Sequence, residues 1–177
     1  MAEYIISMID IPAEGREFTF TDQELWSEPA QACGLQATIV QPLEGRLSVF
    51  PQGPKACLVR GTLTGRIILP CDRCMNDAPV DIEQEFDIFE EIGDTDETDE
   101  PRLREEGDIV VLDAGAILWE QFLLALPAKP LCTPDCKGLC SKCGADLNEG
   151  PCGCSADDGD PRMAALRGLT IPDRKKH

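Results

Sequence analysis

Histidine is almost absent from this chain of 177 residues, since the only one is His177 at the last position. A side chain at a chain end is poorly placed for general-base catalysis, so Ser-His-Asp and Cys-His nucleophile schemes are disfavoured. The sequence also lacks a P-loop and a G-x-G-x-x-G motif, so nucleotide turnover is not indicated. Carboxylates alone argue weakly for a two-metal nuclease, and we expect that the protein is not an enzyme.

Long apolar runs are absent as well. The longest candidate, Ile117 to Leu126, is interrupted by Glu120 and Gln121, and it falls short of the roughly 18 residues that a membrane helix needs. The segment Met1 to Ile6 shows no basic stretch before an apolar core, as a secretory signal would. From these absences we expect a cytoplasmic protein that makes no membrane contact and whose thiols stay reduced.

Basic residues are scarce relative to acidic ones, with 16 lysines and arginines against 33 aspartates and glutamates and a formal net charge of −17. The whole excess lies in residues 1–130, because residues 131–177 carry seven residues of each sign. Binding of duplex nucleic acid by the first part is therefore disfavoured, since neutralising phosphates requires lysine and arginine on one face.

The acidic excess is densest between Asp81 and Asp108, where fourteen acidic side chains face only two arginines. Such a run repels itself and resists folding, so we expect a mobile acidic loop at about residues 93–106. A solvated acidic surface is the simpler interpretation. The alternative is a surface that binds a basic protein partner, such as a ribosomal protein.

Cysteine, by contrast, is abundant. Eight of the ten cysteines fall into four close pairs, which are Cys71 and Cys74, Cys132 and Cys136, Cys140 and Cys143, and Cys152 and Cys154. Each pair can put two thiolates on one ion, so four pairs predict one or two structural Zn²⁺ ions in tetrahedral sites. The remaining two, Cys33 and Cys57, stand alone in apolar surroundings and are expected to be small buried side chains.

The distances along the chain predict how the pairs combine. The last two pairs lie within the short segment from Cys140 to Cys154 and can close a local site, with Gly144 free to turn backbone N–H groups toward the sulfurs. The pair Cys132 and Cys136 is then left to meet Cys71 and Cys74. This second site would join the β-rich part of the chain to the segment that follows it.

Hydrophobic patterning predicts an α+β fold, with an antiparallel β-rich sheet or open barrel, a packed helix and a C-terminal cysteine-knuckle metal-binding segment. The domain boundary is expected between residues 1–130 and 131–177. Alternating apolar and polar residues predict strands at residues 4–11, 17–20, 35–40, 44–49, 56–69, 80–89 and 108–112.

Three helices are expected. Residues 22–26 form a short capped helix, and Asp113 caps a longer apolar helix that ends at Pro127 and packs on the sheet. A final helix begins at Asp160 and Pro161 and reaches Leu169, followed by a basic tail. The basic residues of the C-terminal part are Lys137, Lys142, Arg162, Arg167, Arg174, Lys175 and Lys176.

The combined motifs resemble one family. They are the sequence Cys71-Asp-Arg-Cys74 after a Gly-rich strand, the segment from Leu124 to Cys132, the segment from Cys136 to Asn148, Cys152-Gly-Cys154 and Asp160-Pro-Arg162. This pattern closely resembles the YceD family, also described as large ribosomal RNA subunit accumulation proteins. The resemblance implies a role in synthesis, processing or stability of large-subunit ribosomal RNA, without an established enzymatic activity.

Three functional hypotheses follow. The first is a non-enzymatic ribosome-biogenesis factor whose C-terminal basic residues contact a ribosomal precursor particle or large-subunit ribosomal RNA, while the acidic region binds a basic protein. The second is a thiol redox protein using Cys71 and Cys74, where Arg73 would favour the thiolate. The third is an iron-binding, rubredoxin-like protein, from which the pair Cys152 and Cys154 departs.

Overall fold

A computed structural model describes residues 4–93, 101–154 and 162. The chain forms two compact units, Met1–Cys136 and Lys137–His177, and each is described by itself. The boundary expected from the sequence lies after Pro130. The helix expected from Asp160 to Leu169 lies outside the described residues, apart from Arg162.

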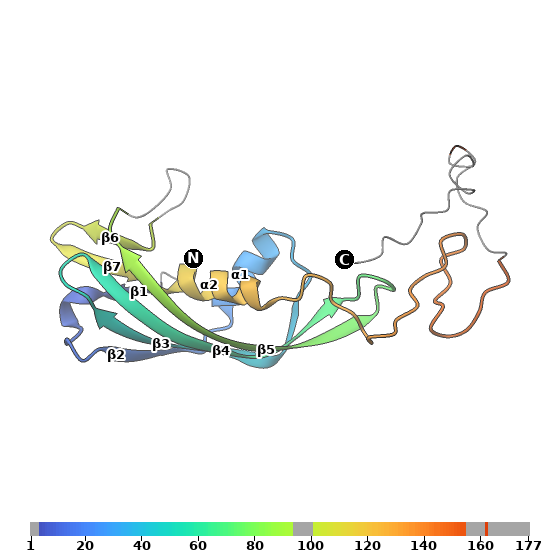
Figure 1. Cartoon of the computed structure of the whole chain (residues 1–177), viewed down its shortest axis with the longest axis horizontal. Coiled ribbons are helices and arrows are strands. Elements are labelled where there is room, and N and C mark those ends of the chain that lie inside the picture. Colours follow the sequence, from blue (N-terminus) through green and yellow to red (C-terminus); the bar gives the residue numbers. More distant parts are fainter. Residues whose placement is uncertain (1–3, 94–100, 155–161, 163–177) are drawn as a thin grey trace, which may run out of the picture. The chain divides into compact units, whose positions relative to one another are not determined.

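In its described residues, 4–93 and 101–136, the first unit contains two antiparallel sheets and two α-helices (Figure 1). A four-stranded sheet has the order β2-β3-β4-β5, and a three-stranded sheet has the order β1-β7-β6. The elements are β1 (Ile5–Ser7), a 3-10 helix η1 (Met8–Asp10), β2 (Arg16–Phe20), α1 (Glu24–Ala32), β3 (Thr38–Pro51), β4 (Ala56–Pro70), β5 (Asp77–Glu91), β6 (Leu103–Glu106), β7 (Ile109–Asp113) and α2 (Ala114–Ala125).

Buried and exposed side chains alternate along the long strands of the large sheet. In β4, Val59, Leu63 and Ile67 are buried while Arg60, Thr62 and Arg66 are exposed. Side chains that alternate in this way bury one face of the sheet and leave the other to solvent. The strands predicted at residues 56–69 and 80–89 are confirmed, and each is slightly longer than expected.

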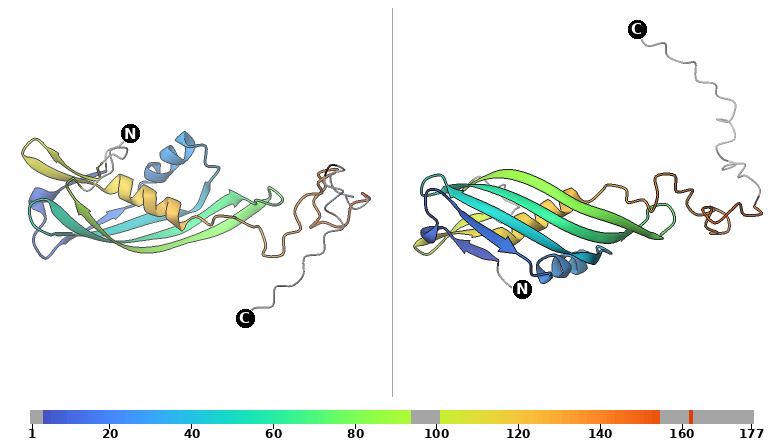
Figure 2. Two further views of the ribbon diagram at one scale, coloured as in Figure 1. Left: turned by 45° about the horizontal axis from the view of Figure 1, so that its top comes forward. Right: turned by 90° about the horizontal axis from the view of Figure 1, so that it is seen from below.

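Helix α2 covers the buried face of the large sheet, and it runs along the curved strands in both views of Figure 2. Its start follows the prediction, because the Asp113 carboxylate accepts a hydrogen bond from Ala116 N at 2.8 Å. Gly45 lets the helix approach, since a Cβ there would lie 2.7 Å from Leu118 Cδ2. Ile117, Leu118 and Phe122 fill the core between the helix and the sheet.

Several expected boundaries are wrong. The two strands predicted at residues 35–40 and 44–49 are one strand, β3, whose register shifts twice against β4. Of the strand predicted at residues 4–11, only Ile5–Ser7 pairs, and Met8 O accepts from Ile11 N in a turn. The first helix was expected to be short, over residues 22–26, but it runs from Glu24 to Ala32, and Asp22 Oδ1 accepts a hydrogen bond from Glu24 N at its start.

The prediction of an acidic loop at residues 93–106 is wrong for the second half of that range. Leu103–Glu106 form β6, which pairs with β7, because Leu103 is buried and its neighbours Arg104 and Glu106 form an ion pair. Residues 94–100 lie outside the described residues. Alternation of one apolar side chain with charged ones was too short a signal to predict this strand.

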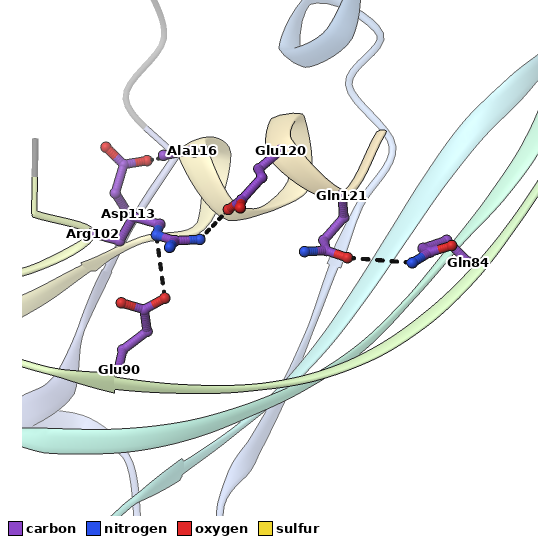
Figure 3. A network of polar contacts seen from close by, with 7 residues as sticks. All are labelled: Gln84, Glu90, Arg102, Asp113, Ala116, Glu120 and Gln121. Carbon is purple, nitrogen blue, oxygen red and sulfur yellow. Dashed lines mark hydrogen bonds and ion pairs between the residues drawn. The ribbon is translucent and has the colours of Figure 1, made fainter. Parts of the chain in front are cut away.

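A polar network centred on Arg102, the residue before β6, joins this part of the chain to β5 and α2 (Figure 3). The Arg102 guanidinium forms ion pairs with Glu90 of β5, at 3.2 Å, and with Glu120 of α2. Glu90 is the more enclosed partner, with its side chain 12% exposed against 45% for Glu120. Nearby, Gln84 donates to Gln121, the buried polar residue of α2, at 3.5 Å.

Within the part of the chain that the structure describes, no helix is long and apolar enough to cross a membrane.

Candidate metal centres

Eight thiols gather into two groups of four. The first thiol group consists of Cys71, Cys74, Cys132 and Cys136, and the second of Cys140, Cys143, Cys152 and Cys154. Within each group the sulfur atoms lie within 4.8 Å of one another. The structure therefore combines the cysteine pairs as their spacing along the chain predicted.

The first thiol group lies where the hairpin of β4 and β5 turns. Pro70 and Asp77 are the last paired residues of the hairpin, and Cys71 and Cys74 lie in the turn between them. Cys132 and Cys136 come from the segment that follows α2. The strand end thus presents the first knuckle, as the sequence indicated.

Main-chain contacts hold the two halves of the first thiol group together. Asp72 N donates to Pro130 O at 2.9 Å, and the Arg73 guanidinium donates to Cys136 O at 2.6 Å. Cys71, Cys74 and Cys136 are buried together with Ala78. From the sequence, Arg73 was expected only to favour the thiolate. Its contact with Cys136 O was not predicted, because it depends on a segment far along the chain.

The second thiol group is built on a turn of the same design. In the first turn, Cys71 N donates to Asn76 O at 2.8 Å and Met75 N to Cys71 O at 2.9 Å. In the second turn the same bonds run from Cys140 N to Ala145 O at 2.8 Å and from Gly144 N to Cys140 O at 2.9 Å. A single bridge between Leu139 and Asp146 flanks this second turn, where Pro70 and Asp77 flank the first.

Both turns place the residue after the second cysteine in the left-handed region. Gly144 has φ 72°, as the sequence predicted, and Met75 has φ 64°. Such a conformation suits glycine and costs another residue about 1 kcal/mol or more. Met75 was missed as a structural element of the site, although its place after Cys74 matches that of Gly144 after Cys143.

The segment around the second thiol group is fastened by side-chain caps. Asn148 Oδ1 accepts from Lys137 N at 2.8 Å, and Asp146 Oδ1 accepts from Asn148 N at 2.8 Å. Leu147 N donates to Gly138 O at 2.9 Å. Cys143 and Cys154 remain exposed, so this group is more open to solvent than the first.

The sulfur positions of the first group suit a tetrahedral thiolate site. Cys74 Sγ lies 3.5 Å from Cys132 Sγ, and Cys71 Sγ lies 3.8 Å from Cys136 Sγ. Four sulfurs at about 2.3 Å from a Zn²⁺ ion stand about 3.8 Å from one another, whereas a disulfide requires about 2.05 Å. None of the ten cysteines, all of which lie in the described part of the chain, forms a disulfide. Four soft ligands with no open position fit a structural zinc ion.

The surroundings of the first group shift the pKa values of two of its cysteines in opposite directions. Burial raises the pKa of Cys71, but the backbone N–H groups of Cys132, Arg73 and Cys74 lower it more, to about 6. The Asn76 N–H lowers the pKa of Cys74, but burial and the surrounding thiols outweigh it and raise the value to about 12. The surroundings therefore favour a thiolate at Cys71 and disfavour a second one at Cys74, and a bound cation would favour the charged form of both.

The second group behaves in the same way. The backbone N–H groups of Cys143 and Lys142, together with the Cys152 thiol, lower the pKa of Cys140 to about 6. The Cys143 thiol and burial raise the pKa of Cys154 to about 12. In both groups the low value belongs to the first cysteine of the knuckle, where the turn directs N–H groups at the sulfur.

The two cysteines outside the groups differ from each other. Cys57 is fully buried as expected, and burial with the nearby Glu90 carboxylate raises its pKa to about 11. Cys33 was expected to be buried and is exposed, because it follows the last turn of α1, where its thiol donates to Ala30 O at 3.4 Å. Neither lies in a thiol group.

The basic residues expected to contact RNA can be placed only in part. Lys137, Lys142 and Arg162 are exposed. Arg167, Arg174, Lys175 and Lys176 lie outside the described residues.

The chain matches the model of one protein family and is similar to several curated proteins. A family model described as "Large ribosomal RNA subunit accumulation protein YceD" matches residues 59–170. Three uncharacterized mycobacterial proteins, one from Mycobacterium bovis and two from strains of Mycobacterium tuberculosis, are each 33% identical to this chain over 120 residues. The match covers 66% of this chain, and the chain spans 56% of the length of these curated relatives. No solved structure matches the chain.

Proposed function

Because the chain belongs to the YceD family, which points to a ribosome-related role, we propose that it is a non-enzymatic ribosome-biogenesis factor that supports accumulation of large-subunit ribosomal RNA. The match over residues 59–170 carries this proposal, since it spans most of β4, all of β5 and α2, and both thiol groups. The family description names accumulation of an RNA and no chemical reaction. The two groups of four thiols agree with a role in binding, because four thiolates on one ion leave no open position for catalysis.

In this proposal both thiol groups hold structural Zn²⁺. Zinc bound by four thiolates has no open position for water, so the ion stabilises the fold and activates no nucleophile. The ion in the first group would fasten the β4–β5 turn to the segment after α2, and the ion in the second would hold the small turn around Cys140. The described part of the segment around the second thiol group buries too few apolar side chains to fold without a cross-link.

The two units would contact different partners. The first carries the acidic excess and would bind a basic protein of the precursor particle. Lys137, Lys142, Arg162 and the basic residues after it would contact ribosomal RNA. Two zinc sites with four thiolates each make the chain more negative by about four charges, so contact with RNA must depend on these local cations rather than on the global field.

Depletion of the protein from growing cells tests this function. Large-subunit ribosomal RNA should fall relative to small-subunit RNA, and a restored copy should recover it. A copy with Lys142→Glu and Arg162→Glu should recover less, whereas Arg16→Glu with Lys55→Glu, which makes the same charge change at exposed sites elsewhere, serves as the control. An unchanged ratio of the two RNAs after depletion would exclude the proposed role.

A thiol redox role for Cys71 and Cys74 remains a second candidate, favoured by the lowered pKa of Cys71. The reactivity of the thiols distinguishes this redox role from the zinc proposal. Zinc-loaded protein should react slowly with a thiol reagent and show no reductase activity, whereas a redox protein should cycle between thiol and disulfide. Elemental analysis of the purified protein also separates zinc from iron.

A further inference from the structure

Strand β5 is an unusually long free edge. It is the last strand of the order β2-β3-β4-β5 and pairs with β4 without a register shift from Asp77 to Glu91 (Figure 2). No backbone hydrogen bond joins residues 77–89 to anything but β4 within the part of the chain that the structure describes. In an antiparallel pair about every second residue directs its N–H and C=O away from the partner strand. These groups form a ready template for another strand.

Strand β5 lacks two of the usual protections of an edge strand, since it is neither short nor bulged. Edges are commonly kept short, bulged or protected with lysine. The opposite edge, β2, has only five residues, whereas β5 has fifteen and contains no lysine or arginine. Its one proline, Pro79, lies near the start. What it does carry is negative charge.

The acidic side chains of β5 lie on one face at every second position. Asp81, Glu83, Glu85 and Asp87 are all exposed, and the residues between them point toward α2 and the core. The two outer members are partly neutralised by β4, since Arg66 pairs with Asp81 at 2.5 Å and Arg60 with Asp87 at 2.9 Å.

The two central carboxylates are not neutralised in this way. Glu83 and Glu85 lie opposite Thr64 and Thr62 in the register, and neither has an ion pair or side-chain hydrogen bond within the described residues. The short threonine side chains leave a shallow hollow of about 690 Å³ beside them, which Arg66 and Asp81 also line. Long side chains arriving from the edge have room to reach both carboxylates.

We propose that β5 accepts an extended basic peptide segment as a fifth strand, whose lysine or arginine side chains at alternate positions lie along Asp81, Glu83, Glu85 and Asp87. This inference rests on the proposed function, because it specifies how the acidic unit binds a basic protein. The backbone of β5 supplies hydrogen bonds to the added strand. Because side chains alternate between the two faces of a strand, the basic side chains of the peptide then lie beside the acidic side chains of β5. An all-acidic edge repels a second copy of itself and attracts a cationic strand.

A peptide assay with the full-length, zinc-loaded protein tests the inference. The probe is a labelled ten-residue peptide that alternates lysine and threonine, and its affinity is measured by fluorescence anisotropy. A peptide of the same composition with its lysines in adjacent pairs places them on both faces, and we expect it to bind at least fivefold more weakly. Two further versions carry N-methyl groups on every lysine amide or on every threonine amide. At least one of them should lose binding, because one edge of the peptide must donate to β5.

Protein variants distinguish binding at the β5 edge from general attraction by the net negative charge of the protein. Glu83→Gln with Glu85→Gln should weaken binding about tenfold, while Glu14→Gln with Glu28→Gln, which removes the same charge at exposed sites elsewhere, should change it less than twofold. Amide hydrogen exchange on β5 should slow when the peptide binds. Equal weakening by both variants, full binding by both N-methylated peptides, or unchanged exchange on β5 would each overturn the inference. Since the assay contains no ribosomal particle, its failure leaves the proposed RNA role standing, and normal RNA levels after depletion leave this binding result standing.

Discussion

Met75 and Gly144 occupy the same position in two turns with matching hydrogen bonds, at φ 64° and 72°. One turn belongs to the large sheet and the other to the small C-terminal unit, yet both direct backbone N–H groups at the first sulfur of a knuckle. The geometry is therefore a property of the turn and does not depend on glycine.

The left-handed backbone conformation of Met75 leads to a prediction for Met75→Gly. Removing the side chain relieves a left-handed conformation that costs about 1 kcal/mol, so the first site should bind Zn²⁺ about fivefold more tightly. Competition with a chromophoric chelator measures the affinity. Gly144→Ala is the matched change in the opposite direction and should weaken the second site by a similar factor. Equal affinities in Met75→Gly and the unchanged protein would show that the turn is not strained.

Loss of single cysteines should separate the two sites. Cys71→Ser and Cys140→Ser should each release one of two zinc equivalents, measured by elemental analysis. Both tryptophans, Trp26 and Trp119, lie in the first unit, so tryptophan fluorescence follows that unit alone.

The same variants should differ in stability. Cys71→Ser should lower the fluorescence melting temperature by about 5 °C or more, because the first ion closes a long loop. Cys140→Ser should leave this melting temperature nearly unchanged. A protein that loses both equivalents on either substitution would argue against independent sites.

The single tyrosine offers a titration with a defined sign. Burial and a 2.7 Å hydrogen bond to Asp22 raise the pKa of Tyr4 to about 12, above the value of about 10 in an unfolded chain. The contribution to stability is therefore complete below pH 10 and is lost as the pH rises toward 12. Absorbance at alkaline pH reports Tyr4 alone, and Asp22→Asn should move its midpoint toward 10. A midpoint unaffected by this change would contradict the assigned contact.

Substitution at Arg102 tests the network between β5, β6 and α2. Arg102→Met removes the cation beside the mostly enclosed Glu90, and we expect a loss of about 2–4 kcal/mol in the free energy of unfolding. Glu120→Gln removes the more exposed partner of the same arginine and should cost less than about 1 kcal/mol. Urea unfolding monitored by tryptophan fluorescence measures both. Similar costs for the two variants would mean that burial does not distinguish the carboxylates.

The close approach of α2 depends on a missing side chain. Gly45→Ala would place Cβ 2.7 Å from Leu118 Cδ2, so we expect a loss of about 1–3 kcal/mol in the free energy of unfolding. Leu118→Ala alone should cost about 2–5 kcal/mol. The double variant should cost less than the two changes together, because the new methyl group then occupies vacated space. Additive costs in urea unfolding would place the strain elsewhere.

Local patterns in the sequence were sufficient for the elements whose signals are short in range. Asp113 caps α2 as predicted because an N-cap needs only the next few residues, and Gly144 turns as predicted for the same reason. The grouping of the cysteines also followed from spacing. The assignment of β6 failed because its four residues owe their pairing to β7 and their position to the buried Leu103, and a window of that length holds almost no periodic signal.

By itself, the sequence determined the β-rich class, the two sets of four thiols and the acidic excess, because composition and spacing are properties of the chain alone. Only the tertiary structure decided that Arg73 reaches Cys136 O, that Cys33 is exposed while Cys57 is buried, and that β5 forms a free edge. Each of these depends on which segments meet after folding. Pairing order and burial arise from contacts between residues far apart in the chain, and no local pattern records them.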